Sequence, residues 1–525
     1  MRRPGARAAA TAAYALLFGL AVILTQWRAG AFWADRGLTA DEAAHFVSSA
    51  MIADFLRSGA WSRPVAFAID YYAHLPRMAI GHWPPLFHLF QGLIFVVTGP
   101  SVAVALIFQA VIAGLACAVP AALCRDRLGW AAGFAAGLLV AASPNFLFLT
   151  GAVMLDNLTG LMVLLCTLAW ADYAERPSRG RAGLLAAAAI AALMTKGNAL
   201  GLVFLPVIHC AVTRRWTLLV RPATLAAAAA VGVVVLPWYL LTYHLSAAGF
   251  NYAGGWDYSS RAVPAYADFF WRMIGIPAAG AVLISLWRRL GDGRDDPTLS
   301  ACAAALIATL AFQMIAPADL QPRYLIALLP LAALLAIDGL SLALSRLPRW
   351  RSAILVGAAL VSVAGVARLP RSSSFGTELL ARAVETSGAP NPLVLLCLSP
   401  TGEGAAIASF AADEPVPRHS LVRASQALST SGFMGGDYRL LLSSADEVGH
   451  WLAEHEIGWL ILEESEAARA WPHNVLVAEA VQRAGWRPEA RIERPQGAVA
   501  LYRLPASQAI PADVGWLLRQ RGRSD

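Results

Sequence analysis

The chain has 525 residues, of which 58% are hydrophobic and only 14% are charged, and its mean hydropathy is +0.56. Soluble domains carry about 25% charged residues, so this composition excludes an ordinary soluble protein and indicates several membrane spans. The formal charge of +7 does not point to nucleic acid, because almost all of it is arginine distributed among the loops, with a single lysine, Lys196.

About eleven apolar segments approach the roughly 17–25 residues that a spanning helix needs. In chain order they are 9–27, 101–123, 130–149, 157–173, 182–195, 199–212, 223–243, 273–287, 299–316, 324–343 and 352–367. The apolar core of the first segment exceeds the ~7–15 residues of a signal peptide, which predicts a retained span. The short segments within 182–212 are alternatively kinked or partly re-entrant.

A further apolar segment, "PPLFHLFQGLIFVVTG" at 84–99, is short and contains a histidine and a glutamine. The positive-inside rule decides how it is placed, because arginine-rich loops favour the cytoplasm. If 84–99 does not cross, the arginine clusters fall on one side: 2–7, 125–127, 176–181, 214–221, 288–294 and 346–351. We therefore predict a re-entrant or interfacial helix at 84–99, a cytoplasmic N-terminus and an outside C-terminus.

From about residue 371 the pattern changes to short apolar strands alternating with helices. "NPLVLLCLSP" reads as a buried strand, "TGEGAAIASFAA" as a helix, and "SADEVGHWLAEHEIGWLILEES" as a helix followed by a strand. This alternation predicts an α/β domain. The expected organisation is a transmembrane domain at 1–370 and an extracytoplasmic α/β domain at 371–525.

With this topology, polar residues from several loops fall at the outer membrane boundary, where ionisable groups are functional candidates by default. They are Asp41, Glu42, His45, His82, Asp156, Asn157, Lys196, Asn198, Trp256, Asp257, Tyr258, Arg323 and Tyr324. The first acids lie in "LTADEAAHF", where Thr39 to Glu42 also fits a capping box. Asp41 and His45 are four residues apart and share a helix face.

Each of the other candidates also has a structural interpretation. Asp156 follows a loop and fits a helix N-cap, while Lys196 and Arg323 fit cations that extend toward the interface. His82 fits a cap for the helix that starts at the Pro-Pro pair, and the aromatic residues of 251–273 fit an interfacial belt. Taken together, carboxylates that act as a base or bind a cation, with nearby cations for a phosphate, suit group transfer from a lipid-linked phosphate.

Five short motifs in chain order resemble the GT-C glycosyltransferases that use polyprenyl-phosphate sugars, in the bacterial protein O-mannosyltransferase and aminoarabinose-transferase-like group. They are "ADEAAHF", "HWPPLFHLFQGLIFVVTG", "SPNFLFLTGAVMLDNLTGLM", "LMTKGNALGLVFLP" and "QPRYLIALLP". The resemblance covers about residues 9–345. Members often carry lysine before the Pro-Pro pair, where this chain has Trp83.

The resemblance implies an α-helical polytopic enzyme that transfers a sugar with inversion from a polyprenyl phosphate to an acceptor hydroxyl. By this analogy Asp41 is the principal catalytic acid, and Asp156 and Glu42 are further acidic site residues. Lys196 and Arg323 then lie near the lipid phosphate. The expected substrate-binding set is His45, His82, Lys196, Arg323, Tyr324, Trp256 and Tyr258.

Several alternatives stay open at the level of sequence. Mg²⁺ or Mn²⁺ bound at Asp41, Glu42 and Asp156 is one, because enzymes of this kind differ in their use of a metal. The expected partners are the lipid-linked donor, membrane lipids, and a lipid, glycan or protein acceptor in a bacterial cytoplasmic membrane. The competing function is a multi-span transporter or flippase of lipid-linked sugars, which should place polar groups such as Gln109 and Asp338 along its path.

Overall fold

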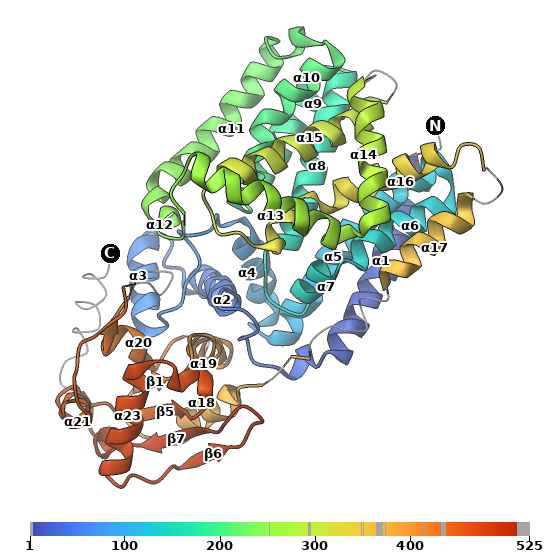
Figure 1. Cartoon of the computed structure of the whole chain (residues 1–525). Coiled ribbons are helices and arrows are strands. Elements are labelled where there is room, and N and C mark those ends of the chain that lie inside the picture. Colours follow the sequence, from blue (N-terminus) through green and yellow to red (C-terminus); the bar gives the residue numbers. More distant parts are fainter. Residues whose placement is uncertain are drawn as a thin grey trace. The chain divides into compact units, whose positions relative to one another are not determined.

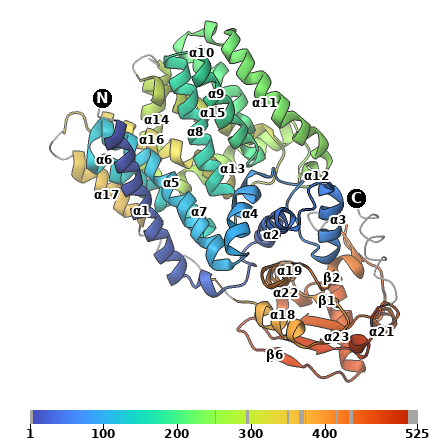
Figure 2. The same cartoon turned by 180° about the vertical axis from the view of Figure 1, so that it is seen from behind.

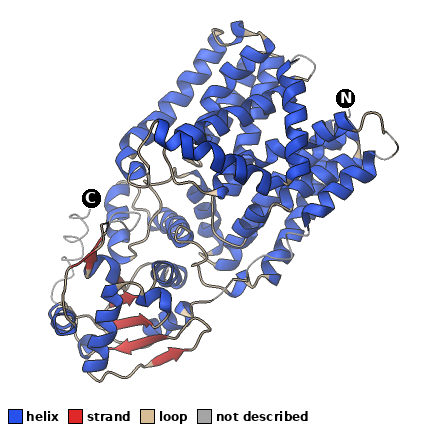
Figure 3. Cartoon of the chain, in the orientation of Figure 1, coloured by secondary structure: helices blue, strands red, loops and turns tan. Residues whose placement is uncertain are grey.

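The computed structural model describes residues 4–250, 252–291, 296–347, 349, 351–363, 371–372, 374–414, 416–431 and 437–511. The fold is mainly helical, and all strands lie in the C-terminal part of the described chain (Figures 1 and 3). The chain forms two compact units: the first holds residues 1–29, 81–87 and 106–371, and the second holds 30–80, 88–105 and 372–525.

The first unit is a bundle of apolar helices. Its elements are α1 (Pro4–Arg28), α5 (Val102–Leu128), α6 (Trp130–Ala141), α7 (Pro144–Thr150), α8 (Asp156–Glu175), α9 (Arg179–Leu193), η2 (Gly197–Phe204), α10 (Leu205–Thr213), η3 (Trp216–Leu218), α11 (Pro222–Leu241), α12 (Tyr243–Ala247), α13 (Trp256–Ile274), α14 (Ile276–Gly291), α15 (Pro297–Ile315), η4 (Pro322–Leu328), α16 (Leu329–Ala343) and α17 (Arg351–Val363). The chain passes to the second unit within α4 (Leu86–Thr98) and returns within α5.

Six of the described helical segments are long and apolar enough to cross a bilayer, and two bent helix pairs raise this number to eight. One bent pair is α6 with α7, at 67°, and the other is α13 with α14, at 111°. Pro144 opens α7, and Gly275 between α13 and α14 has a positive φ of 82° that favours glycine. The predicted polytopic helical class is confirmed, whereas the predicted number of about eleven spans stays a prediction.

Close helix packing in this bundle depends on a glycine and a buried ion pair. A Cβ at Gly339 on α16 would lie 1.8 Å from the backbone oxygen of Ala281 on α14, so only glycine fits there. Further along α14, Ser285 donates to Asp338 at 2.6 Å, and one turn later Arg289 binds Asp338 through two nitrogens at 2.6 and 3.1 Å. These charges can be buried because Arg289 binds the Asp338 carboxylate through two hydrogen bonds and Ser285 adds a third.

Within residues 84–99, Leu86–Thr98 form the short helix α4, which is below the length of a spanning helix. We predict that it does not cross the membrane. Reporter fusions after residue 128 should then be cytoplasmic, and fusions after residues 156, 255 and 400 should lie outside. A cytoplasmic signal after residue 156 together with an outside signal after 128 would invert every later loop and contradict this topology.

The second unit combines helices from an early loop with the C-terminal α/β domain. Its helices are η1 (Ala31–Trp33), α2 (Glu42–Ser58), α3 (Pro64–His74), α18 (Thr377–Thr386), α19 (Pro400–Asp413), α20 (Ala424–Ala427), α21 (Ala445–Glu454), α22 (Glu466–Arg469), α23 (Pro472–Arg483) and η6 (Pro505–Gln508). Its strands are β1 (Leu393–Cys397), β2 (Ser420–Arg423), β3 (Ser429–Thr430), β4 (Arg439–Leu440), β5 (Trp459–Glu463), β6 (Ala490–Ile492) and β7 (Val499–Arg503).

The main sheet has the strand order β2-β1-β5-β7-β6. β1 pairs in parallel with β2 and β5, and β7 pairs antiparallel with β5 and β6. β1 and β5 are buried along their whole length, which fits their continuous apolar sequences. The predicted strands and helices of this region are therefore confirmed as an α/β fold. The structure adds 30–80 and 88–105 to the same compact unit, while the boundary between 370 and 371 stays a prediction.

Glu385 on α18 gives the α/β domain a predicted pH dependence. Burial, with repulsion from Asp413 and Glu414, raises the pKa of Glu385 to about 7. A raised carboxyl pKa stabilises the fold below the unfolded pKa, and this stability is lost as the pH rises through about 7. In thermal unfolding at pH 8 we expect Glu385→Gln to be more stable by on the order of 1 kcal/mol, after allowance for solvent screening.

Most of the gain should disappear near pH 4, where Glu385 is mostly neutral in both folded and unfolded chains. Glu479→Gln, which makes the same change on the exposed face of α23, is the matched control and should leave the pH dependence unchanged. Equal curves for Glu385→Gln and the unaltered chain from pH 4 to 8 would contradict this account.

Candidate active site

The residues expected at the site fall into two groups, one in each compact unit. The first unit holds His82, Asp156, Lys196, Trp256, Tyr258, Arg323 and Tyr324, and the second unit holds Asp41, Glu42 and His45. The contacts within each group show which side chains are already bound by the fold.

In the first unit, Asp156 and Lys196 form a buried ion pair. Asp156 is the first residue of α8, and Lys196 directly precedes η2. The Lys196 Nζ lies 2.5 Å from Oδ1 of Asp156, and the two residues are only 5% and 2% exposed. Asp156 is not the N-cap of α8, since Leu155 holds that position, and the buried Lys196 does not extend to solvent. Burying these charges is tolerable because each is the counterion of the other.

The ring of Tyr324 links Lys196 to a second cation, Arg323. Lys196 Nζ lies 5.1 Å from the centre of this ring, and the Arg323 guanidinium carbon lies 5.7 Å from it. Both distances are within the range of a cation–π interaction. Asn198 Nδ2 also donates to the backbone oxygen of Tyr324 at 3.5 Å. The starts of α8, η2 and η4 thus bring two cations and one carboxylate together.

The Oδ2 atom of Asp156 accepts no hydrogen bond within the described part of the chain, although it is buried. Buried carboxylate oxygens are normally satisfied by protein, water or a ligand. With two cations and a single acid, this group carries a local formal charge of +1, which suits an anionic ligand such as a phosphate.

The remaining candidates of the first unit have different environments. His82 Nδ1 lies 2.9 Å from the backbone oxygen of Leu245, so this nitrogen carries the proton and donates. Tyr258 is fully buried and donates from its hydroxyl to the backbone oxygen of Gln313 at 2.9 Å. Trp256 is 84% exposed at the start of α13. Tyr258 is therefore occupied as a packing residue, whereas Trp256 presents an open ring.

In the second unit, Glu42 is committed to structure. It is fully buried, and its Oε1 lies 3.0 Å from an Arg36 nitrogen, while Oε2 accepts from the backbone nitrogen of Leu38 at 2.8 Å. The hydroxyl of Thr39 accepts from the Glu42 nitrogen at 3.2 Å, which is one half of the predicted capping box. The sequence does not reveal Arg36 as the partner of Glu42.

Asp41 occupies the N-cap position of α2, directly before Glu42. Its side chain makes no capping hydrogen bond to α2 within the described residues, and it is half-buried. Its backbone oxygen accepts from the His45 nitrogen at 3.1 Å, which starts the helix. Of the two adjacent acids, Glu42 is therefore the one whose carboxylate fixes the chain at the helix start.

A polar cluster joins α2 to the part of α4 that lies in the second unit. His45 Nδ1 lies 3.0 Å from His88 Nε2, so one of these nitrogens donates and the other accepts. Ser49 donates to Oε1 of Gln91 at 2.9 Å, and all four residues are buried. His45 is thus held by another histidine one turn after Asp41. The cluster could have been predicted from the sequence, because His88 and Gln91 are polar residues within the otherwise apolar segment 84–99.

The described residues contain no group of three or more His, Cys, Asp and Glu side chains that is arranged to hold a metal ion. Metal binding at Asp41, Glu42 and Asp156 thus stays an untested expectation. The Glu42 carboxylate is the least suited of the three, because its two oxygens already accept from Arg36 and Leu38.

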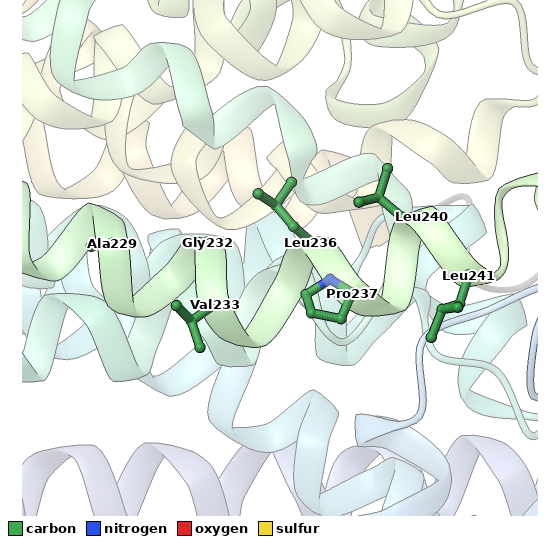
Figure 4. A pocket seen from close by; sticks show the side chains of 7 residues that line it. All are labelled: Ala229, Gly232, Val233, Leu236, Pro237, Leu240 and Leu241. Carbon is green, nitrogen blue, oxygen red and sulfur yellow. The ribbon is translucent and has the colours of Figure 1, made fainter.

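An apolar hollow of about 670 Å³ lies along α11 (Figure 4). Its lining is Ala229, Gly232, Val233, Leu236, Pro237, Leu240 and Leu241. Val233 and Leu240 are about three-quarters exposed, at 75% and 74%. No polar side chain lines the hollow, so it suits hydrocarbon and offers nothing for catalysis.

Comparison with known proteins identifies the fold. A family model described as dolichyl-phosphate-mannose-protein mannosyltransferase matches residues 82–240. No curated protein matches the chain by sequence. The crystal structure of apo ArnT from Cupriavidus metallidurans aligns with a TM-score of 0.60 and 16% identity, over 95% of this chain and 99% of ArnT.

The same ArnT bound to undecaprenyl phosphate aligns with a TM-score of 0.61 and 16% identity, over 93% of this chain and 98% of ArnT. An oligosaccharyltransferase from Archaeoglobus fulgidus aligns less well, with a TM-score of 0.48 and 13% identity, over 80% of this chain and 64% of that chain. The family model and ArnT support the GT-C fold that the sequence predicts. The chain is a multi-pass membrane protein with the GT-C glycosyltransferase fold.

Proposed function

We propose that the chain transfers a sugar from an undecaprenyl-phosphate-linked donor to an acceptor hydroxyl, with inversion, at the outer face of the cytoplasmic membrane. The observation that supports this most is the group formed by Lys196, Arg323 and Tyr324 beside the buried Asp156. A net positive group at the ends of apolar helices suits a phosphate that is attached to a membrane lipid. The ArnT structure with undecaprenyl phosphate adds the class of lipid carrier.

In the proposed reaction, the acceptor oxygen attacks the anomeric carbon and forms the new glycosidic bond. Asp41 takes the proton of the acceptor hydroxyl as this bond forms. The bond from the anomeric carbon to the phosphate oxygen breaks on the opposite side, so the configuration inverts and undecaprenyl phosphate leaves as an anion. Lys196 and Arg323 lower the barrier because they offset the charge that develops on this leaving group.

The remaining candidates receive supporting roles in this proposal. Asp156 orients the Lys196 ammonium, and His82 and Trp256 are assigned to the sugar or lipid carrier. His45, held by His88, is assigned to the acceptor or sugar. A divalent cation at the acids stays an alternative, and transfer activity in the presence of a strong chelator tests it directly.

The competing function, transport of lipid-linked sugars, lacks a supporting observation. Gln109 and Asp338 are the polar groups that the sequence places away from the membrane boundary. Gln109 donates to the backbone oxygen of Met154 at 2.6 Å, and Asp338 is bound by Arg289 and Ser285. Both therefore make contacts within the helix bundle.

Binding of the lipid carrier tests the proposal. In nanodiscs, undecaprenyl phosphate should raise the melting temperature of the chain, whereas undecaprenol, which lacks the phosphate, should not. Arg323→Gln should weaken this effect, and Arg346→Gln, which removes an arginine elsewhere in the chain, should not. Equal effects of the phosphate and the alcohol would contradict a phosphate site.

A further inference from the structure

The α/β domain contacts the helix that carries Asp41, within one compact unit. Helix α19 packs against α2, and the two lie side by side in both views (Figures 1 and 2). The contact is close at Gly404 on α19, where an added Cβ would lie 3.0 Å from the Cβ of Ala43. Ala43 is almost fully buried and follows Asp41 by two residues. A side chain at position 404 would therefore press on the first turn of α2.

Arg77 lies at the same contact, in the loop that follows α3. Its guanidinium donates to the backbone oxygen of Ala40, the residue before Asp41. The Arg77 Nε lies 3.7 Å and its Cζ 3.9 Å from the position that a Gly404 Cβ would take. A glycine at 404 thus leaves room for both the first turn of α2 and this guanidinium.

The charges around Arg77 come from both α2 and the α/β domain. Burial and the repulsion of Arg423 lower the pKa of Arg77 to about 10, while Glu403 and Asp41 act in the opposite direction. Arg77 thus stays a cation at neutral pH. Glu403 is fully buried and accepts from Arg423 at 2.7 Å and from the Ser425 hydroxyl at 2.7 Å. These bonds fix the Glu403 side chain within the α/β domain.

The chain before α2 is fixed by the same domain. The carboxylate of Asp35 accepts from the backbone nitrogen of Thr377 at 3.1 Å, at the start of α18. Gly37 approaches the ring of Phe375 so closely that a Cβ would lie 2.6 Å from it. Arg36, between these two residues, holds Glu42. The α/β domain therefore contacts the chain on both sides of Asp41.

We propose that Arg77 is a positioning residue for Asp41, and that α19 supports it from the α/β domain. This inference rests on the proposed role of Asp41 as the base. Arg77 contacts no reacting atom in this account; it fixes the backbone from which the Asp41 carboxylate projects. The α/β domain then affects the rate of transfer while contributing no reacting group, because a displacement of about 1 Å in a catalytic group costs about 100-fold in rate.

The first test is Arg77→Gln in the full chain. We expect kcat to fall about 10- to 100-fold, with the KM for the donor and the affinity for undecaprenyl phosphate unchanged. Arg77→Lys, which keeps the charge and one donor, should recover part of this loss. Arg487→Gln, which changes an exposed arginine of the α/β domain in the same compact unit, is the matched control and should keep the original kcat.

The second test avoids removal of a charge. Gly404→Ala should lower kcat because its methyl group meets Ala43, and the double variant Gly404→Ala with Ala43→Gly should recover activity because this methyl contact is removed. Recovery in the double variant supports the inference even where Arg77→Gln fails to fold. A fully active Gly404→Ala enzyme, or a double variant no better than the single one, would overturn it.

A double-mutant cycle separates this inference from the proposed function. If Arg77 acts through Asp41, Arg77→Gln should cause no further loss in the Asp41→Asn background. An active Asp41→Asn enzyme would refute the proposed base. An inactive Asp41→Asn enzyme combined with a fully active Arg77→Gln enzyme would refute the positioning role alone.

Discussion

Asp41→Asn is expected to lower kcat for sugar transfer by about 10²–10⁴-fold, which is the range for loss of a general base. Asparagine has nearly the same size and still suits the N-cap of α2, so folding and membrane insertion should be retained. Binding of undecaprenyl phosphate should also be retained, since Lys196 and Arg323 are unchanged. Transfer by the purified variant, compared with lipid binding by the same preparation, measures both effects.

Glu42→Gln is the matched comparison for Asp41→Asn, because the two acids are adjacent yet have different contacts. Glutamine removes the charge that faces the buried Arg36, and loss of one partner of a buried pair typically costs about 3–5 kcal/mol. We therefore expect a lower melting temperature, with most of the activity kept per folded molecule. A Glu42→Gln enzyme that is stable and inactive, beside an active Asp41→Asn enzyme, would reverse the assignment of the two acids.

The second large effect is expected at the buried pair of Asp156 and Lys196. Lys196→Gln leaves the Asp156 carboxylate buried without its counterion, at a cost of about 3–5 kcal/mol. The double variant Lys196→Gln with Asp156→Asn replaces the charged pair by a neutral one and should regain most of this stability. Thermal unfolding in detergent or nanodiscs measures the recovery.

The double variant also separates folding from function. Because it lacks the Lys196 charge, we expect it to bind undecaprenyl phosphate at least 10-fold more weakly than the unaltered chain, although it is folded. Arg181→Gln, which breaks the exposed pair with Asp172, is the control and should change neither property. Full lipid binding by the folded double variant would exclude Lys196 from the phosphate site.

Local pattern was sufficient to predict the elements of the α/β domain. The continuous apolar sequences of β1 and β5 predicted buried strands, and the structure places both inside the sheet. The sequence was sufficient to predict a polytopic helical protein, but hydropathy alone does not determine the number of spans. The breaks at Pro144 and Gly275 divide apolar stretches into bent pairs, and whether such a pair crosses once depends on packing rather than on hydropathy.

The residues of the candidate site were predictable one by one, but their partners were not. Glu42 was expected in a capping box with Thr39, yet its main partner is Arg36, an ordinary loop arginine in the sequence. Lys196 and Asp156 were both singled out, whereas their direct pairing depends on a contact across 40 residues. Arg77 and Gly404 gave no sequence signal, because their importance arises only where α19 meets α2.

The central claim, transfer from a lipid phosphate, is tested most directly by supplying undecaprenyl-phosphate-linked sugars to the purified chain and to Asp41→Asn, with envelope extract as the source of acceptor. Mass spectrometry should detect free undecaprenyl phosphate and a glycosylated acceptor of inverted anomeric configuration with the unaltered chain, and about 10²–10⁴-fold less of both with Asp41→Asn. Transfer that continues at the full rate in Asp41→Asn, or donors that stay intact with the unaltered chain across the sugars of the envelope, would contradict the account.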